Sequence, residues 1–417
     1  MAARSAQPLP ETPSGVRDRL LRAAQAQILA AGFFEANMEQ IARRAGTSKQ
    51  TIYANFQSKE DLFREVLRMT MAEAGQAGEP DIASLGFAEA VRAYVLWIEK
   101  SALNPENLEL YRANIAAAAA FPALAAELHH LRQTASHMGH RLLTHPGRAH
   151  LPAIPAERLS SWLGVLAMAG PRALLGFTPT PDERRARQQA IVQLCTGGWR
   201  MLVEPCPAAL PLIEPAAHAP RQIEPGSRLS PERWTHLLRI ALRGFAQTGL
   251  RHTSVEEIGA VAQISKMTIY KRFGNKQGLF AAAIDQAVDD LLAVREPLTF
   301  DGDIRSALEI VARQQDHWVQ RPEYSALLCL MITQAPAHEA MIQCAWSRLT
   351  APTLNELSTR LRQWQAEGAV HLVDPVIAAE QFLLLAARGN RRLTATLPWE
   401  EDEVRRHARD VVSLFYH

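Results

Sequence analysis

Cysteine is scarce in this sequence of 417 residues, which contains four: Cys195, Cys206, Cys329 and Cys344. They lie 11 or more residues apart, so the chain has no C-x-x-C pair of the kind that holds zinc or exchanges disulfides. Four cysteines are also too few to form a disulfide scaffold in a chain of this length. We therefore expect a protein of the reducing cytoplasm.

Long hydrophobic runs are lacking too. The longest, residues 115–126, contains Pro122 and is shorter than the roughly 20 residues that a membrane-spanning helix needs. Residues 1–13 are polar and proline-rich, without the apolar centre of a signal peptide. These absences predict a soluble, cytoplasmic protein with no membrane partner.

An excess of either charge is absent, because 45 Lys and Arg residues face 43 Asp and Glu residues. Lysine itself is rare, and all but one of the lysines fall in two short stretches, at 49–59 and 266–276. With 47% hydrophobic and 21% charged residues the chain can bury sizeable cores, and its length suits two to four domains.

Catalytic motifs are missing as well. The chain has no G-x-S-x-G, no phosphate-binding loop and no dinucleotide fingerprint. His338-Glu339 begins like a zinc-protease motif, but Ile342 stands where the second histidine must be. Four histidines share one predicted helical stretch: His129, His130, His137 and His140. No carboxylate or cysteine completes that set, which favours a solvated or pocket-lining role over a metal site. We predict no enzymatic activity, no metal and no cofactor.

What the sequence does contain is an internal repeat at a spacing of 217 residues. Residues 41–63 (IARRAGTSKQTIYANFQSKEDLF) and 258–280 (IGAVAQISKMTIYKRFGNKQGLF) are identical at eleven of 23 positions without a gap. A period near 200 residues is too long for a solenoid repeat, so we interpret the chain as a tandem duplication. Between the copies, residues 205–231 hold seven prolines, which predict a semi-rigid linker.

Each copy begins with the pattern of a helix-turn-helix. Asn37 and Ser254 are each followed three positions later by Gln or Glu, the spacing of a helix N-cap. A short turn follows, and Ser48 or Ser265 then caps a second short helix whose polar and aromatic side chains lie away from its apolar face. Two short helices joined by a tight turn are what binding in a DNA major groove requires.

Basic charge is concentrated in the same segments. Residues 14–70 and 228–290 each carry nine basic and six acidic residues, which leaves the rest of the chain acidic. Lys59 and Lys276 stand in the first turn of the next predicted helix, where a positive charge opposes the helix dipole. We therefore expect these two lysines to contact an external anion, namely a DNA phosphate.

These stretches resemble the helix-turn-helix signature of the TetR/AcrR family of bacterial transcriptional regulators. The shared elements are Ser-Lys-x-Thr-Ile-Tyr-x-x-Phe, a lysine three residues later, and then Leu-Phe. The resemblance implies an all-α fold of two tandem TetR-like units. Each unit would have an N-terminal three-helix DNA-binding domain and a helical domain that binds a ligand and dimerises through its last two helices.

The candidate DNA-binding residues, helix caps included, follow from this pattern. In the first copy they are Asn37, Ser48, Lys49, Gln50, Thr51, Tyr53, Asn55 and Lys59. In the second copy they are Ser254, Ser265, Lys266, Met267, Thr268, Tyr270, Lys271, Arg272 and Lys276. Gln263 departs from the family pattern, which has glycine at that turn position, as Gly46 does in the first copy. A left-handed backbone there would cost glutamine about 1 kcal/mol.

In chain order, we expect a helix-turn-helix domain at 14–70, a helical C-terminal domain at 80–203, a proline-rich linker at 204–228, a second helix-turn-helix domain at 229–290 and a second C-terminal domain at 297–417. The last two helices expected in each half occupy the family's dimerisation position, at about 156–176 with 183–202 and at 376–393 with 400–416. They carry apolar faces, formed by Trp162, Leu163, Val165 and Leu166 and by Phe382, Leu383, Leu385 and Ala386. Core packing explains these faces equally well. Four tryptophans fit either a ligand pocket or a core: Trp97, Trp318, Trp346 and Trp364.

The predicted function is a sequence-specific transcriptional regulator, namely a repressor that a small apolar ligand releases from DNA. One chain is expected to act as a pseudo-dimer on a double-stranded operator, and a dimer of chains is the rival arrangement. The half-sites should differ, because Gln50 corresponds to Met267 and Asn55 to Arg272, so that the second copy would prefer guanine. The alternative function is a ligand-binding or scaffold protein of the same fold that has lost operator binding.

Overall fold

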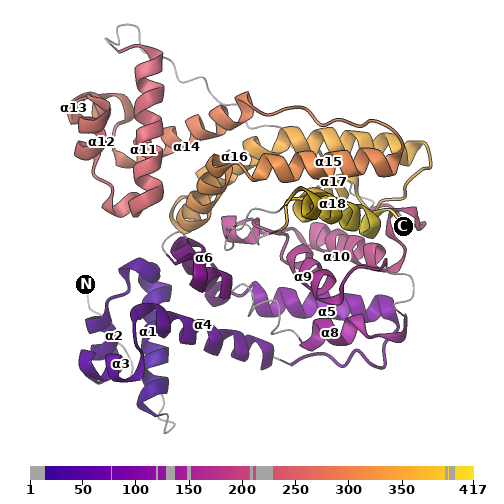
Figure 1. The fold of residues 1–417 in the computed structure, drawn as a ribbon, viewed down its shortest axis with the longest axis horizontal. Helices are drawn as coiled ribbons and strands as arrows, with labels where there is room; N and C mark the ends of the chain where they lie inside the picture. The colour runs from indigo at the N-terminus through magenta and orange to yellow at the C-terminus, as the bar shows by residue number, and fades with distance from the viewer. Residues whose placement is uncertain are drawn as a thin grey trace.

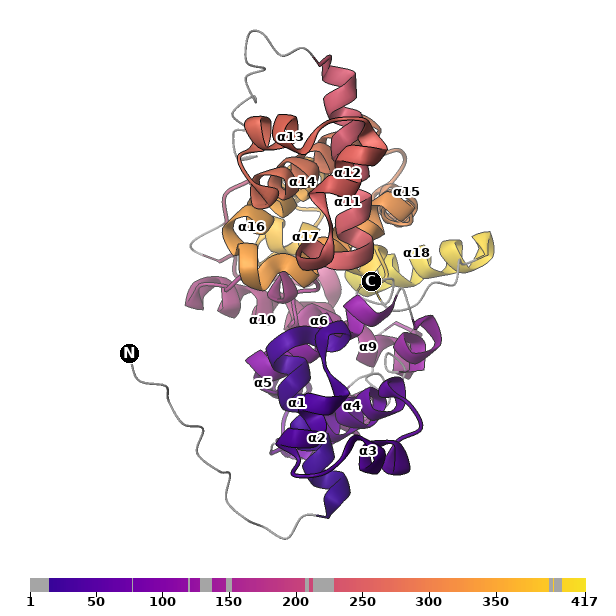
Figure 2. The ribbon, with the colours of Figure 1, turned by 90° about the vertical axis from the view of Figure 1, so that its left-hand side faces the viewer.

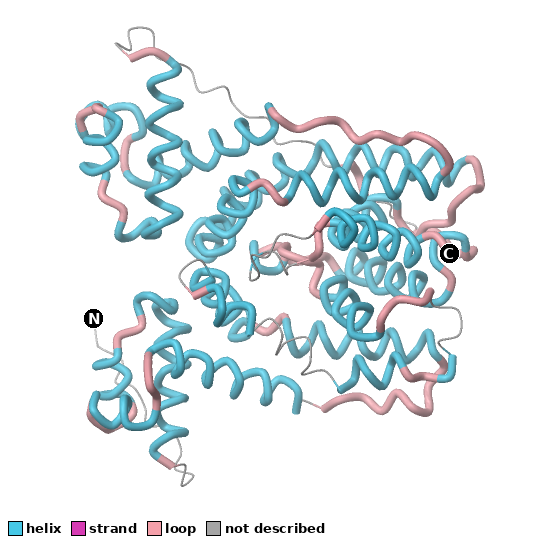
Figure 3. The backbone as a smooth tube through the Cα atoms, in the orientation of Figure 1, coloured by secondary structure: helices cyan, strands magenta, loops and turns pink. Residues whose placement is uncertain are grey.

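A computed structural model of the chain describes residues 15–76, 78–118, 121–127, 137–147, 152–206, 210–212, 229–389, 393 and 400–417. The regular elements in these ranges are all helices (Figure 3), which confirms the predicted all-α class. Within these ranges no helix is both long enough and apolar enough to cross a bilayer. Most of the linker predicted at 204–228, like His129 and His130, lies outside the described residues.

The two halves contain corresponding helices in the same order (Figure 1). The first half consists of α1 (Val16–Glu35), α2 (Met38–Arg44), α3 (Lys49–Asn55), α4 (Lys59–Gln76), α5 (Phe87–Ala102), α6 (Pro105–Ala118), α8 (His137–Leu143), α9 (Ala156–Ala167), η2 (Ala173–Leu175), α10 (Pro181–Thr196) and η3 (Gly198–Arg200). The second consists of α11 (Pro231–His252), α12 (Val255–Ala262), α13 (Lys266–Phe273), α14 (Lys276–Ala293), α15 (Ile304–Val319), α16 (Pro322–Ala366), α17 (Pro375–Ala386) and α18 (Glu401–Phe415). The predicted domain limits near 70 and 290 lie close to the ends of α4 and α14 and stay a prediction.

The first helix of each half is held by its apolar stripe. Leu20 and Ala24 of α1 are fully buried, and so are the equivalent Leu237 and Ala241 of α11. In each copy the first helix packs against the first short helix and against the helix that follows the second, and all four share one apolar cluster. Burial of the stripe, rather than helix propensity alone, therefore stabilises each three-helix domain.

Three of the helices expected at the dimerisation position are shorter than predicted. α9 ends at Ala167 rather than near 176, and α17 ends at Ala386 rather than near 393. Each is followed by two residues with left-handed backbone, Ala169-Gly170 and Arg388-Gly389 (φ from 50° to 61°). A left-handed backbone cannot continue a right-handed helix. The helix expected over 183–202 likewise stops at Thr196, before a pair of glycines.

The halves pack against each other through α9, α10, α17 and α18, which share one apolar core. A Cβ added to Gly170 would lie 2.4 Å from Leu384 Cδ1, and one added to Gly389 would lie 2.8 Å from Val165 Cγ1. α9 and α17 have the same length, and when they are aligned from end to end Gly170 corresponds to Gly389 and Val165 to Leu384. The same contact is thus made twice in opposite directions, which is the pattern of a two-fold interface.

Charged groups also meet between the halves. The Arg187 guanidinium, itself buried, lies 2.7 Å from the Glu380 carboxylate, and Arg172 Nε lies 3.5 Å from Glu380 Oε1. Burial alone would raise the pKa of the Glu380 carboxyl, but the two guanidiniums outweigh it and hold that pKa below its ordinary value. Arg158 forms a further ion pair with Asp410. The interface therefore combines an apolar core with compensated charges.

Candidate DNA-binding surface

The four predicted helix caps are confirmed by their hydrogen bonds. Asn37 Oδ1 accepts from the backbone N–H of Glu39 at 2.8 Å, and Ser48 Oγ accepts from that of Thr51 at 3.1 Å. Ser254 and Ser265 accept equivalent bonds, each at 3.2 Å. These four polar side chains thus satisfy amide groups at the starts of the two short helices. Ser48 and Ser265 thereby mark where each recognition helix, α3 or α13, begins.

The turn between the two short helices has a left-handed residue in both copies. Gly46 has φ 65° and Gln263 has φ 55°, ψ 42°. The second turn therefore keeps the backbone geometry of the first although glutamine replaces glycine. The Gln263 carbonyl accepts a 3.1 Å hydrogen bond from Arg233, which supports this strained position.

One face of each recognition helix is open to solvent. Tyr53 is 49% exposed and Met267 is 84% exposed, and Gln50 and Thr268 are exposed as well. Tyr270 and Thr51 are half-buried. Because the N-terminal residues of a recognition helix reach base edges, Gln50 and Met267 occupy the positions best placed for base contact.

Each copy contains the same lysine–glutamate pair beside its recognition helix. Lys49 Nζ lies 3.5 Å from Glu39 Oε1, and Lys266 pairs with Glu256 at the equivalent positions. All four side chains are about half exposed, and an exposed ion pair contributes at most about 1 kcal/mol. A DNA phosphate that approached either lysine would have only this weak pair to displace.

The structure does not bring Asn55 and Arg272 to the open surface. Asn55 Nδ2 donates to the Thr51 carbonyl at 2.8 Å, so its amide lies against its own helix. The Arg272 guanidinium lies 5.4 Å from the centre of the Trp234 ring, on α11. Base contact by either side chain would first require it to leave these partners, whereas Lys271 beside Arg272 is exposed.

Lys59 and Lys276 begin α4 and α14 and contact the end of the first helix of their own copy. Lys59 Nζ is 4.9 Å from the centre of the Phe33 ring, and Lys276 Nζ donates to the Arg251 carbonyl at 2.8 Å. Both lysines are half-buried. They therefore join two helices within the domain, in addition to the phosphate contact expected of them.

Sequence reasoning missed one exposed pair of positions. Arg44 ends α2 and Val261, at the equivalent position of α12, is 67% exposed. The repeat alignment already contained the signal, because a basic residue corresponds there to an exposed apolar one. At this position, and at the one where Met267 replaces Gln50, the second surface is less polar than the first.

The two recognition helices lie on the same side of the molecule. Figure 2 views that side directly and shows α13 in the upper part and α3 in the lower part, each carried by its three-helix domain. The C-terminal helices lie behind both domains. One chain therefore presents two helix-turn-helix units in a common direction.

Comparison with known proteins identifies both units. The model of bacterial regulatory proteins of the tetR family matches residues 20–66 and again residues 237–283. The model of the C-terminal domain of AefR-like transcriptional repressors matches residues 306–417. The HTH-type transcriptional repressor SCO4008 of Streptomyces coelicolor is 28% identical over 158 residues, which is 37% of this chain and 74% of that protein.

Solved structures of similar proteins each correspond to less than half of the chain. A TetR-family transcriptional regulator from Mesorhizobium loti is 22% identical, with a TM-score of 0.38, and covers 44% of this chain and 95% of its own. A TetR-family regulator from Vibrio parahaemolyticus is 26% identical, with a TM-score of 0.35, and covers 43% of this chain and 97% of its own. From the family models that match at both repeats, together with the two helix-turn-helix units described above, we conclude that this chain belongs to the TetR family of bacterial regulatory proteins and is a DNA-binding regulator built as a tandem duplication.

Proposed function

We propose that the chain is a transcriptional repressor that binds its operator as a single-chain pseudo-dimer and is released by a small apolar ligand. The observation that carries the proposal is the pair of helix-turn-helix units on one side of one chain (Figure 2). A recognition helix alone makes few contacts, and a two-fold pair can enter adjacent major grooves about 34–36 Å apart. Here both members of such a pair belong to the same polypeptide.

Pairing within the chain is supported by the contacts between its halves. The reciprocal contacts Gly170–Leu384 and Gly389–Val165 occupy the last helices of each half, which the family resemblance assigns to dimerisation. Those faces are buried within one chain, so a second chain would have to displace them. The start of the linker also lies against the second half, where Cys206 N–H donates to the Val373 carbonyl at 2.7 Å.

The contacts to DNA that we propose differ between the halves. Gln50 and Tyr53 would contact bases in one half-site, and Met267 and Tyr270 would do so in the other. A glutamine amide suits adenine, whereas an apolar side chain suits the thymine methyl group. Guanine contact in the second half-site would come from Lys271, or from Arg272 after it leaves Trp234. The remaining candidate residues would bind phosphates or position the helices.

Repression and release by a ligand are supported by the related proteins and by a cavity in the second half. The curated relative and the C-terminal family model are both described as repressors. A ligand acts as an effector only if it favours one arrangement of the recognition helices, and couplings of about 1–3 kcal/mol are typical. We expect ligand binding to weaken operator binding by about 10- to 100-fold.

The test combines light scattering with a footprint on the DNA upstream of the protein's own gene. We expect a mass near 46.2 kDa, that of one chain, and protection of a site whose two halves differ in sequence. A mass of two chains on a palindromic site would contradict the pseudo-dimer. No protection of any upstream fragment would instead favour a ligand-binding protein that has lost operator binding.

A further inference from the structure

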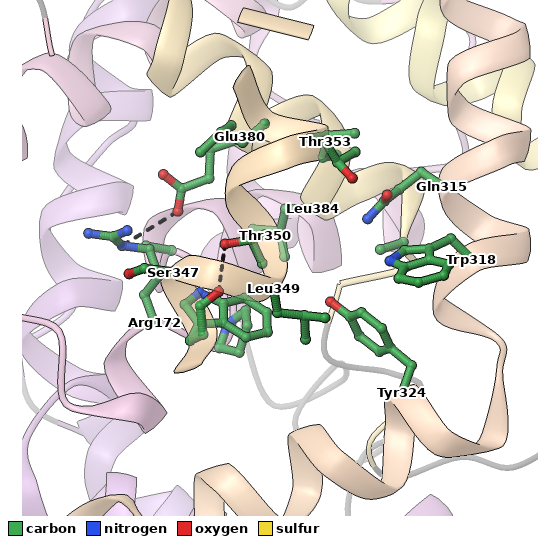
Figure 4. Close-up of a pocket in the computed structure, with 16 residues that line it drawn as sticks. Arg172, Gln315, Trp318, Tyr324, Ser347, Leu349, Thr350, Thr353, Glu380 and Leu384 are labelled. Carbon is green, nitrogen blue, oxygen red and sulfur yellow. Dashed lines mark hydrogen bonds and ion pairs between the residues drawn. The ribbon is translucent and has the colours of Figure 1, made fainter. Parts of the chain in front are cut away.

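A cavity lies in the second half, at its junction with the first (Figure 4). The volume in which a water-sized sphere can be centred is about 80 Å³, and the mouth of the cavity is open to solvent. Most of the wall comes from α15, α16 and α17. Ala169, Pro171 and Arg172 of the first half complete it.

Aromatic rings form one side of this cavity. Trp318 and Tyr324 meet edge to face with their ring centres 6.0 Å apart, and Trp346 lies farther along α16. Leu349, Leu354, Leu383 and Leu384 supply further apolar wall. Of the predicted candidates, Trp318 and Trp346 thus line a pocket, whereas Trp97 and Trp364 are buried in the core. Flat apolar walls of this kind suit an aromatic ring.

The polar groups of the wall favour an uncharged occupant with a hydrogen-bond donor. Arg172 and Glu380, the charged members of the lining, are paired with each other. Gln315 Oε1 is buried without a hydrogen-bond partner, and Figure 4 shows Gln315 beside Trp318 and Tyr324 on one side of the cavity. A buried acceptor without a partner is costly, and a donor on a ligand would remove that cost.

The first half does not repeat this aromatic site. α5 and α15 are equivalent helices of equal length, and the repeat spacing places Ile98 opposite Gln315, Ser101 opposite Trp318 and Asn107 opposite Tyr324. Asn107 donates to the Ser101 carbonyl, so a polar contact occupies the place of the aromatic pair. Duplication has therefore left the two halves with different chemistry at corresponding positions.

The cavity wall is connected to both DNA-binding domains. From the first half, Arg112 Nε of α6 donates to the Leu174 carbonyl at 2.9 Å, just beyond Arg172, and α6 packs on α1. From the second half, Arg348 of α16 lies 3.0 Å from Asp285 of α14, the helix that follows the recognition helix α13. An occupant that moved the wall would therefore act on elements that support both domains.

We infer that each chain binds one small, uncharged, planar aromatic molecule with a hydroxyl or amide donor, in the second half alone. Its ring lies between the aromatic and leucine walls, and its donor bonds to Gln315. The inference rests on the proposed function, because it names the ligand class and the site through which the regulator is released from DNA.

Calorimetry with the full chain and three naphthalene derivatives tests this inference. 2-Naphthol is uncharged and has a donor, 2-methoxynaphthalene lacks the donor, and 2-naphthoate is charged. We expect 2-naphthol to bind with one molecule per chain and the methyl ether to bind about five- to tenfold more weakly. Two molecules per chain, tighter binding of 2-naphthoate, or no saturable 2-naphthol binding would each overturn the inference.

Two variants locate the site. Gln315→Leu should bind 2-naphthol and its methyl ether equally, while Ser101→Ala, at the position equivalent to Trp318, should behave as the native chain does. An unchanged preference in Gln315→Leu, with a native thermal midpoint, would place the molecule elsewhere. A mobility-shift assay of the native chain without any naphthalene derivative tests the proposed function separately. If the chain binds 2-naphthol but no upstream DNA, the proposed function is refuted and the ligand site is not.

Discussion

At the scale of single residues, His407 connects the stability of the interface to pH. Its ring is buried against Trp162 of the other half, with ring centres 5.6 Å apart, and its Nε2–H donates to the Leu385 carbonyl at 2.8 Å. Burial lowers the pKa of His407 to about 4, and the nearby Arg388 and Arg158 act in the same direction. The folded chain therefore holds this imidazole neutral at pH values where the unfolded chain protonates it.

The sign of the pH effect follows from this difference. Between about pH 6.5 and pH 4 the unfolded state binds a proton that the folded state does not, so stability falls as pH falls. We expect His407 to account for a loss of about 2 kcal/mol between pH 7 and pH 5. His407→Phe keeps the ring contact but cannot titrate. Urea unfolding at the two pH values should show a smaller loss for the variant, and equal losses would refute the assignment.

A second prediction at the scale of single residues concerns the phosphate contacts of Lys59 and Lys276. Lys59→Gln should weaken binding to all DNA sequences alike and reduce the dependence of log K on log salt by about one, because one phosphate contact is lost. Lys276→Gln should do the same and also lower the thermal midpoint, since it loses the bond to the Arg251 carbonyl. Lys100→Gln, at an exposed position of α5, removes the same charge and should change neither quantity. A change of base preference with an unaltered salt slope would show that Lys59 contacts bases.

At the scale of helices, the reciprocal glycines at the ends of α9 and α17 control how closely the halves approach. Gly170→Ala would combine a left-handed alanine with a Cβ 2.4 Å from Leu384, and Gly389→Ala would combine the same strain with a contact of 2.8 Å to Val165. The control is Gly368→Ala, where φ is 73° but nothing lies within 4 Å. We expect the interface variants to lose about 1–3 kcal/mol more than the control. Denaturant midpoints measure the difference, and three equal losses would mean that the interface adapts without cost.

At the scale of the whole molecule, covalent linkage allows the halves to recognise different DNA. Met267→Gln gives the second recognition helix the residue of the first, so we expect it to change base preference in one half-site only. A good amide–adenine pair is worth about 1–3 kcal/mol, so binding to an operator with two first-type half-sites should tighten about tenfold. Gln50→Met is the reciprocal control. Anisotropy titrations with native and half-site-swapped operators measure the effect, and altered preference at both half-sites would point to two chains on the DNA.

The helix-turn-helix could be predicted from the sequence because its determinants are local. A capping side chain and the amide that it satisfies lie within three residues of each other, as Ser48 and Thr51 do. The left-handed turn at Gln263 follows from its correspondence to Gly46. The all-α class and the duplication depend on helical periodicity and on the repeat, both of which are properties of the sequence alone.

Only the tertiary structure showed the features that depend on contacts between residues far apart in the sequence. Arg272 is turned toward the ring of Trp234, which lies on another helix, α11. The early ends of α9 and α17 meet Leu384 and Val165 across the interface, and the cavity takes its wall from both halves. Such contacts join residues far apart in the chain, so their geometry depends on how the helices pack against one another. The periodicity of a single helix gives no information about that packing.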